Sequence, residues 1–247
     1  MIEQSYQNQF NTEEGLRRHT VRTFGWMMAG LLVTALSAAL FYFSGISIRI
    51  VLTSPYLMIL SVLLQFGAVI AFMSGIHSRS VGLTRAMFFG YSILTGFTFS
   101  LLGWLYDAQS VMFAFGITAI YFGSLCVIGY TTKVNLMPLG RLLITSLIIM
   151  VIVEVVMMLM GFSTDTMLLS AIGLLIFTGL TAYDTQKMKR LYLSMPDEQG
   201  RNCLAVYSAF ELYLDFINIF LYILRFVGNR NLRRICASEK GREPRTF

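Results

Sequence analysis

Two aspartates in apolar surroundings are the residues of this sequence best placed to carry chemistry. Asp184 lies in Thr181–Gln186 at the end of a long apolar run, and Asp215 lies midway through another, in Leu212–Asn218. Ionisable side chains inside membrane spans are costly and are functional by default. Two carboxylates held close together cannot both carry a charge cheaply, so such a pair would share a proton or bind a divalent cation, which prefers oxygen ligands.

Asp215 also belongs to a polar stripe with helical spacing. Successive members of the stripe are four, three, four and three residues apart, which places them on one side of a helix. We expect this stripe to face the interior of a helical bundle, because the opposite side of the same segment is apolar. The stripe is Glu211, Asp215, Asn218, Tyr222 and Arg225, and the opposite side carries Leu212, Phe216, Ile219, Phe220 and Ile223.

Each of these acidic residues also has a purely structural interpretation. Asp184 could cap the end of its helix or pair with Lys187, and Asp215 could pair with a backbone group or with the arginine that ends the stripe. Glu154, alone in an apolar run, could line a cation path or be protonated and hydrogen-bonded within the bundle. Glu211 could join the aspartates or lie near the lipid headgroups.

The composition indicates a protein of the lipid bilayer. Of the 247 residues, 56% are hydrophobic and 13% are charged, and the mean hydropathy is +0.67. A soluble domain carries about 25% charged residues. The net charge of +6 does not indicate a nucleic-acid partner, because the basic residues stand at the ends of apolar runs. In membrane proteins, Lys and Arg are enriched at such positions in the cytoplasmic loops.

Seven segments are long enough to span a bilayer, for which about 20 apolar residues suffice. The last of them is interrupted by Glu211 and Asp215, so it could cross fully or re-enter the membrane. The sequence therefore predicts an all-α integral membrane protein with seven transmembrane helices. The segments are Thr23–Ile48, Ile50–Ile76, Ala86–Tyr106, Ala108–Thr132, Leu142–Thr164, Thr166–Tyr183 and Asn202–Leu224.

The distribution of basic residues predicts the orientation. With the N-terminus in the cytoplasm, the opposite loops before the seventh segment hold only Arg49, so the positive-inside rule is satisfied. We expect a polar cytoplasmic segment at residues 1–22, a membrane domain at 23–228 and a basic tail at 229–247. The cytoplasmic basic residues are Arg17, Arg18, Arg22, Arg79, Arg85, Lys133, Arg141, Lys187, Lys189, Arg190 and Arg201.

Five segments form a pattern that extends beyond the two aspartates, and together they resemble the Bax inhibitor-1 (transmembrane Bax inhibitor motif) family, particularly its bacterial members. The resemblance covers about residues 16–230, and the two aspartate motifs are its most specific part. The segments are Phe24–Met27, Gly129–Lys133, Thr181–Gln186, Leu212–Asn218 and Leu224–Phe226.

This resemblance implies a fold and an activity. The fold would be a seven-helix bundle around a central hydrophobic helix, and the activity a pH-sensitive calcium leak. Asp184 and Asp215 match the family's diaspartyl sensor and would be the residues that meet calcium or a proton. Arg79 is the nearest match to an arginine that helps to lock the closed state in the family.

Three functions follow from these residues. The leading hypothesis is a cation leak channel of a bacterial inner membrane, with the lipid bilayer and calcium as its partners and no cofactor. A regulatory membrane protein without transport is the alternative. An intramembrane aspartyl protease is less favoured, because Leu212 and Leu214 stand where such proteases carry glycines before their second aspartate. We therefore do not expect an enzyme.

Overall fold

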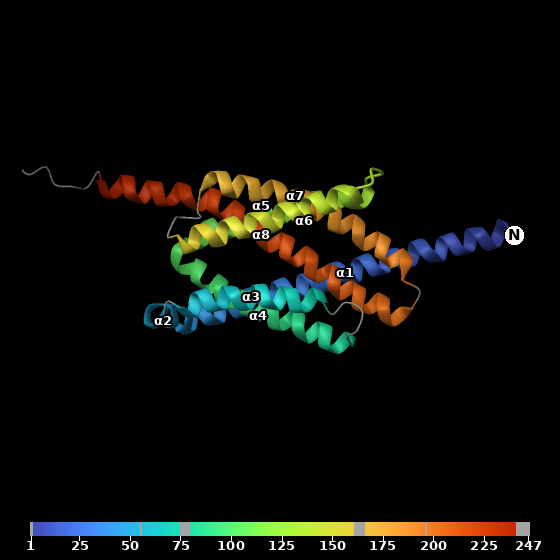
Figure 1. The fold of residues 1–247 in the computed structure, drawn as a ribbon, viewed down its shortest axis with the longest axis horizontal. Coiled ribbons are helices and arrows are strands. Elements are labelled where there is room, and N and C mark those ends of the chain that lie inside the picture. Colours follow the sequence, from blue (N-terminus) through green and yellow to red (C-terminus); the bar gives the residue numbers. More distant parts are fainter. Residues whose placement is uncertain (1, 55, 75–79, 161–165, 196, 241–247) are drawn as a thin grey trace, which may run out of the picture. The chain divides into compact units, whose positions relative to one another are not determined.

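The computed structural model describes residues 2–54, 56–74, 80–160, 166–195 and 197–240; for residues 2–12, 58–59, 158–159 and 229–240 it describes the backbone alone. The described part of the chain is all helical (Figure 1). Its eight helices are α1 (Ile2–Ser44), α2 (Ile46–Thr53), α3 (Tyr56–Ser74), α4 (Val81–Leu105), α5 (Ala108–Thr131), α6 (Met137–Leu159), α7 (Met167–Ser194) and α8 (Glu198–Lys240).

Six of these helices are long and apolar enough to cross a membrane, among the residues that the structure describes. The all-helical prediction is confirmed, whereas seven crossings stay a prediction. The six candidate spans are Glu13–Ser44, Val81–Leu105, Ala108–Thr131, Met137–Met157, Met167–Ser194 and Glu198–Gly228.

The first two predicted spans do not correspond to two continuous helices. The chain turns at Gly45, whose φ of +66° lies in the left-handed region that glycine adopts without strain, and α2 follows. The α2 helix ends at Thr53, two residues before the proline at position 55, which lacks a backbone N–H and disfavours helix in the residue before it. The α3 helix begins at Tyr56 and is described as far as Ser74, so the last two residues of the second predicted span lie outside the described residues.

The helices pack into two compact units. The first comprises Met1–Leu105 and Asp184–Leu214, and the second comprises Tyr106–Tyr183 and Asp215–Phe247. Both α7 and α8 therefore contribute one part to each unit. In either unit the part supplied by α8 is heavily buried: 78% of its apolar window is buried, compared with 11% for α6. Most side chains in that window of α8 are therefore packed against protein.

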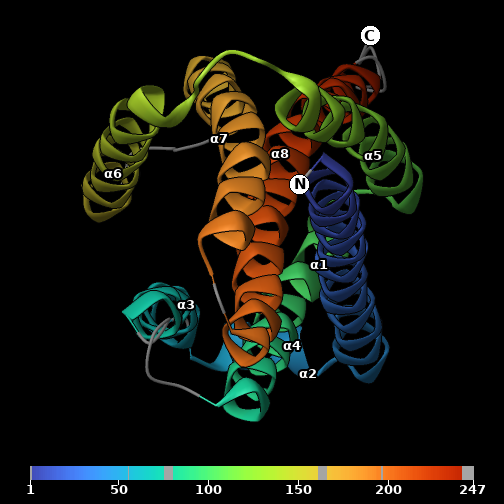
Figure 2. The same cartoon turned by 90° about the vertical axis from the view of Figure 1, so that its right-hand side faces the viewer.

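In the first unit, α1 and α4 lie side by side (Figure 2). The hydroxyl of Thr34 on α1 lies 3.1 Å from the carbonyl oxygen of Ser92 on α4 and 2.7 Å from the hydroxyl of Tyr213 on α8. Aromatic rings fill the adjacent space, including Phe72 of α3, which lies 4.1 Å from the ring of Phe210. Hydrogen-bonded hydroxyls and close aromatic packing are the interactions that hold apolar helices together where burial from water supplies little force.

In the second unit, α5 approaches both α7 and α8. The ring of Phe216 on α8 lies 5.4 Å from Phe122 and 5.6 Å from Phe115, both on α5. Gly129 of α5 lies against the backbone of Ala182 on α7, so closely that a Cβ atom at Gly129 would overlap it. A small residue at such a position lets two helix backbones pack directly against each other.

This close approach predicts that Gly129→Ala lowers the thermal stability of the protein. The added methyl group would force the α5 and α7 backbones apart, and overpacking of this kind costs about 1–3 kcal/mol. Thermal unfolding in detergent measures the effect. The matched control is Gly123→Ala on the same helix, where an added Cβ meets no atom within 4 Å. Equal midpoints of thermal unfolding for the two variants would contradict the close packing of α5 against α7.

Candidate functional site

Asp184 lies in the interior of α7, not at its end. The helix continues to Ser194, ten residues beyond the aspartate, so the interpretation of Asp184 as a helix cap is wrong. The end of the apolar run did not predict the end of the helix, because α7 continues through polar residues beyond it. The Asp184 residue is 9% exposed, so its carboxylate is held inside the first unit.

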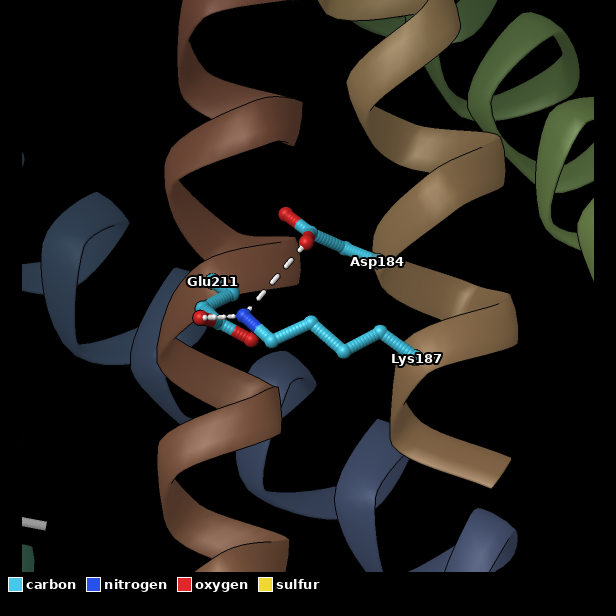
Figure 3. Close-up of polar contacts among 3 residues, drawn as sticks. All are labelled: Asp184, Lys187 and Glu211. Atoms are coloured by element: carbon cyan, nitrogen blue, oxygen red, sulfur yellow. Dashed lines mark hydrogen bonds and ion pairs between the residues drawn. The ribbon is translucent and has the colours of Figure 1, made fainter. Parts of the chain in front are cut away.

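Two charged side chains meet Asp184 within the first unit. The Lys187 ammonium lies one helical turn further along α7, 3.9 Å from Asp184 Oδ1 and 2.5 Å from Glu211 Oε1 on α8. Figure 3 shows the lysine side chain reaching from α7 to lie between the two carboxylates. We call Asp184, Lys187 and Glu211 the acid–lysine cluster. The predicted pairing of Asp184 with a nearby lysine is confirmed, and Glu211 joins the same group instead of standing apart from it.

The acid–lysine cluster is largely shielded from solvent. The side chain of Asp184 is 11% exposed, that of Glu211 is 14% exposed and that of Lys187 is 25% exposed. In such surroundings charges are poorly solvated, so a carboxylate needs a counter-charge, a proton or a bound cation. Two carboxylates facing a single ammonium leave one negative charge uncompensated within the cluster when all three groups are ionised. This arrangement can therefore attract a further proton or cation.

Asp215 is buried in the second unit. It lies on α8 next to Phe216, whose ring packs against α5, and it is 3% exposed. Its predicted pairing with the arginine that ends the stripe is not favoured by helix geometry. Arg225 is ten residues further along α8, a rise of about 15 Å, which is more than the two side chains together can span. The pairing of Asp215 with Asp184 stays a prediction.

The polar stripe of α8 matches the expected arrangement only in part, because Asp215 and Tyr222 are buried, at 3% and 5% exposed. The side that was expected to face away from the bundle is packed as well: Leu212 and Ile219 are fully buried and Phe216 is 4% exposed. On the stripe itself, Glu211 and Asn218 are only partly buried. The burial of the apolar side has a physical reason, because the rings of Phe115 and Phe122 on α5 pack against Phe216. The more accessible edge of α8 consists of three members of the stripe and two leucines: Glu211, Leu214, Asn218, Leu221 and Arg225.

A second ion pair stands on the stripe, within the second unit. Glu154 Oε1 of α6 lies 3.8 Å from Arg225 Nη1 of α8, and the two side chains are 28% and 26% exposed. The Arg225 guanidinium also lies 5.5 Å from the ring centre of Tyr222, which is buried. Glu154 is therefore paired with an arginine, an interaction that the sequence did not indicate because 71 residues separate the two.

Some of the predicted site residues stand apart from these clusters. Arg79 lies outside the described residues, so its role as a latch stays a prediction. Among the described residues, no three His, Cys, Asp or Glu side chains gather as a metal site. Asp184 and Glu211 nevertheless offer the carboxylate oxygens that calcium prefers, and calcium takes further oxygen ligands from water.

Lys187 was expected as a structural partner of Asp184 and not as a member of a functional site. Its spacing of three residues from Asp184 indicated the contact between them, since such residues are neighbours on a helix. The contact of Lys187 with Glu211 depends on how α7 and α8 align, and that alignment is not encoded in any local pattern.

Comparison with known proteins agrees with the helices and the motifs. The sequence profile of the family described as "Inhibitor of apoptosis-promoting Bax1" matches residues 16–232. An uncharacterized protein of Borreliella burgdorferi is 38% identical over 210 residues, which is 85% of this chain and 90% of the relative. The inner membrane protein YbhL of Escherichia coli K12 is 36% identical over 218 residues, or 87% and 93% of the two chains.

A third relative extends the match to almost the full length. It is an uncharacterized protein of Deinococcus radiodurans, 33% identical over 230 residues, which is 93% of this chain and 98% of the relative. The residues matched by the profile include both aspartate motifs and nearly all of the six candidate spans. The resemblance found in the sequence is thereby confirmed, and the chain belongs to the Bax inhibitor-1 family of integral membrane proteins.

Proposed function

We propose that this protein is a pH-sensitive cation leak channel, with calcium as the ion it conducts. The observation that carries the proposal is the acid–lysine cluster, in which the buried Asp184 shares one ammonium with Glu211. A protein that needed only stability would gain little from such a group, since apolar residues of similar volume serve as well or better. Buried carboxylates between membrane helices are instead typical of ion and proton pathways.

Gating would depend on protons shared by Asp184 and Asp215. With one proton between them, the pair carries a single charge and a hydrogen bond that holds α7 and α8 in a closed arrangement. Loss of that proton causes repulsion, and gain of a second proton weakens the shared bond. Either change would release the helices, and the resulting pH dependence is the signature that we expect.

The more accessible edge of α8 supplies a route for the ion. Glu211, Asn218 and Arg225 all keep part of their surface exposed, and Glu154 lies beside the last of them. Polar groups at intervals along one side of an enclosed helix can replace water around a passing cation. The carboxylates would attract cations, whereas the arginine would limit their entry.

We also propose the remaining features of topology and location. The protein would lie in the inner membrane, as the name of its Escherichia coli relative states for that protein. With the N-terminus in the cytoplasm, seven crossings would place the basic tail on the opposite side of the membrane. Reporter domains fused to each end would test both positions. The protein would carry no cofactor and catalyse no reaction.

Calcium entry into proteoliposomes tests the function. Purified protein is reconstituted into vesicles loaded with a calcium-sensitive dye, and entry is followed at a series of pH values. We expect calcium entry to change with pH and to exceed that of protein-free vesicles at the most permissive pH. Entry no faster than in protein-free vesicles at any pH, with the protein folded, would refute the leak and favour the regulatory alternative.

A further inference from the structure

The acid–lysine cluster already holds a cation that belongs to the protein. The Lys187 ammonium occupies the space between the carboxylates of Asp184 and Glu211, where Figure 3 shows all three side chains converging. A proton- or cation-sensing site made of aspartates alone does not need this lysine. A cation that arrives from solvent therefore meets carboxylates that already contact an ammonium group.

We propose that Lys187 is an internal competitor for cations and sets the calcium affinity of this cluster. Its ammonium and a calcium ion seek the same carboxylate oxygens, so calcium binds only after the ammonium has moved away. This inference deepens the proposed function and rests on it for its role in transport. The competition itself is a property of binding that can be measured without transport.

The geometry favours a displacement in which the lysine leaves Asp184 first. The ammonium lies 2.5 Å from Glu211 but 3.9 Å from Asp184, so its hold on the aspartate is the weaker one. A quarter of the Lys187 side chain is exposed, so its flexible stem can carry the ammonium toward solvent. Asp184 would thereby become available to an arriving cation, while Glu211 would be the last group to release the lysine.

The charges predict the direction of the effect. With all three groups ionised, the cluster carries a net charge of −1, from two carboxylates and one ammonium. Lys187→Met keeps the length and the apolar stem but leaves a charge of −2, so calcium should bind more tightly. We expect an increase in affinity of about thirtyfold, the size of effect that one unit charge about 4 Å away exerts on a divalent ion at the dielectric constant of water.

The experiment compares four full-length proteins in detergent, with calorimetric titration of calcium chloride as the readout. Lys187→Arg retains the charge and should bind calcium about as the wild type does. The double variant Lys187→Met, Glu211→Gln restores the net charge of −1 and should bring the affinity back toward the wild-type value. If Lys187 were only structural, Lys187→Met would lower the melting temperature without tightening calcium binding, and this result would overturn the proposal.

A measurement on the wild type keeps the inference testable if Lys187→Met does not fold. Calcium that displaces the ammonium should increase the rate at which Lys187 is acetylated by acetic anhydride, read by mass spectrometry, several-fold at saturation. An unchanged rate would overturn the competition. Failure of the proposed function is distinguishable, because vesicles without calcium flux, together with tighter calcium binding in Lys187→Met, would refute the leak and support the competition.

Discussion

Replacing Asp215 with asparagine is expected to make the calcium leak nearly independent of pH. The amide has almost the shape of the carboxyl group, so a side chain that is 3% exposed can be exchanged with little change in packing. It cannot gain or lose a proton in the working range, however, so the shared-proton state no longer exists. Between about pH 5 and about pH 8 we expect the wild-type rate to change about tenfold and the Asp215→Asn rate to change by less than about twofold.

An exposed aspartate supplies the control for this prediction. Asp197 accepts a hydrogen bond from the backbone N–H of Gly200 and is exposed. The variant Asp197→Asn therefore tests the replacement of a carboxylate by an amide at a position away from the buried sites. That variant should keep the full pH dependence. If Asp215→Asn retained the pH profile of the wild type, Asp215 would not be the group that senses protons.

Arg225→Ala is expected to cause a clear loss of stability. The guanidinium is the cation that lies beside Glu154, at 3.8 Å, and it also rests near the Tyr222 ring. Removing it leaves a negative charge in an apolar part of the second unit. Both side chains are about one-quarter exposed, so we expect a cost of about 2 kcal/mol, between the values for exposed and for buried ion pairs. Thermal unfolding monitored by size-exclusion chromatography measures it.

The source of that loss can be identified with two further variants. Arg225→Lys retains a positive charge and should lose less stability than Arg225→Ala. The double variant Glu154→Gln, Arg225→Ala removes the uncompensated carboxylate and should recover part of the loss. If the double variant were no more stable than Arg225→Ala, the arginine would act through packing and not through the ion pair.

The sequence predicted the helices well, because each apolar run is long and most are bounded by charges. It located the ends less well, since hydropathy does not register backbone breaks or polar continuations of a helix. The first two spans show the first limit: a break at Gly45 falls within the first and one beside the proline at position 55 falls within the second, although the surrounding residues are apolar. Helix α7 shows the second, because it continues ten residues beyond Asp184 through a polar segment.

The site was predictable where its contacts are local and not where they join distant helices. Asp184 and Lys187 are three residues apart on one helix, so their contact follows from helix geometry alone. The contacts of Lys187 with Glu211 and of Glu154 with Arg225 depend on packing between helices. The orientation of the polar stripe was also not readable, because aromatic rings from other helices decide which side of α8 is buried.

The measurement that tests the account most directly is the pH profile of calcium flux for Asp184→Asn, Asp215→Asn and the double variant in proteoliposomes. If the two aspartates share one proton, either single substitution removes the same titration, and the double variant should behave like the single variants. Additive shifts, in which each aspartate contributes its own step and the double variant loses both, would contradict a shared proton. A wild-type profile retained in all three variants would remove the pair from the mechanism altogether.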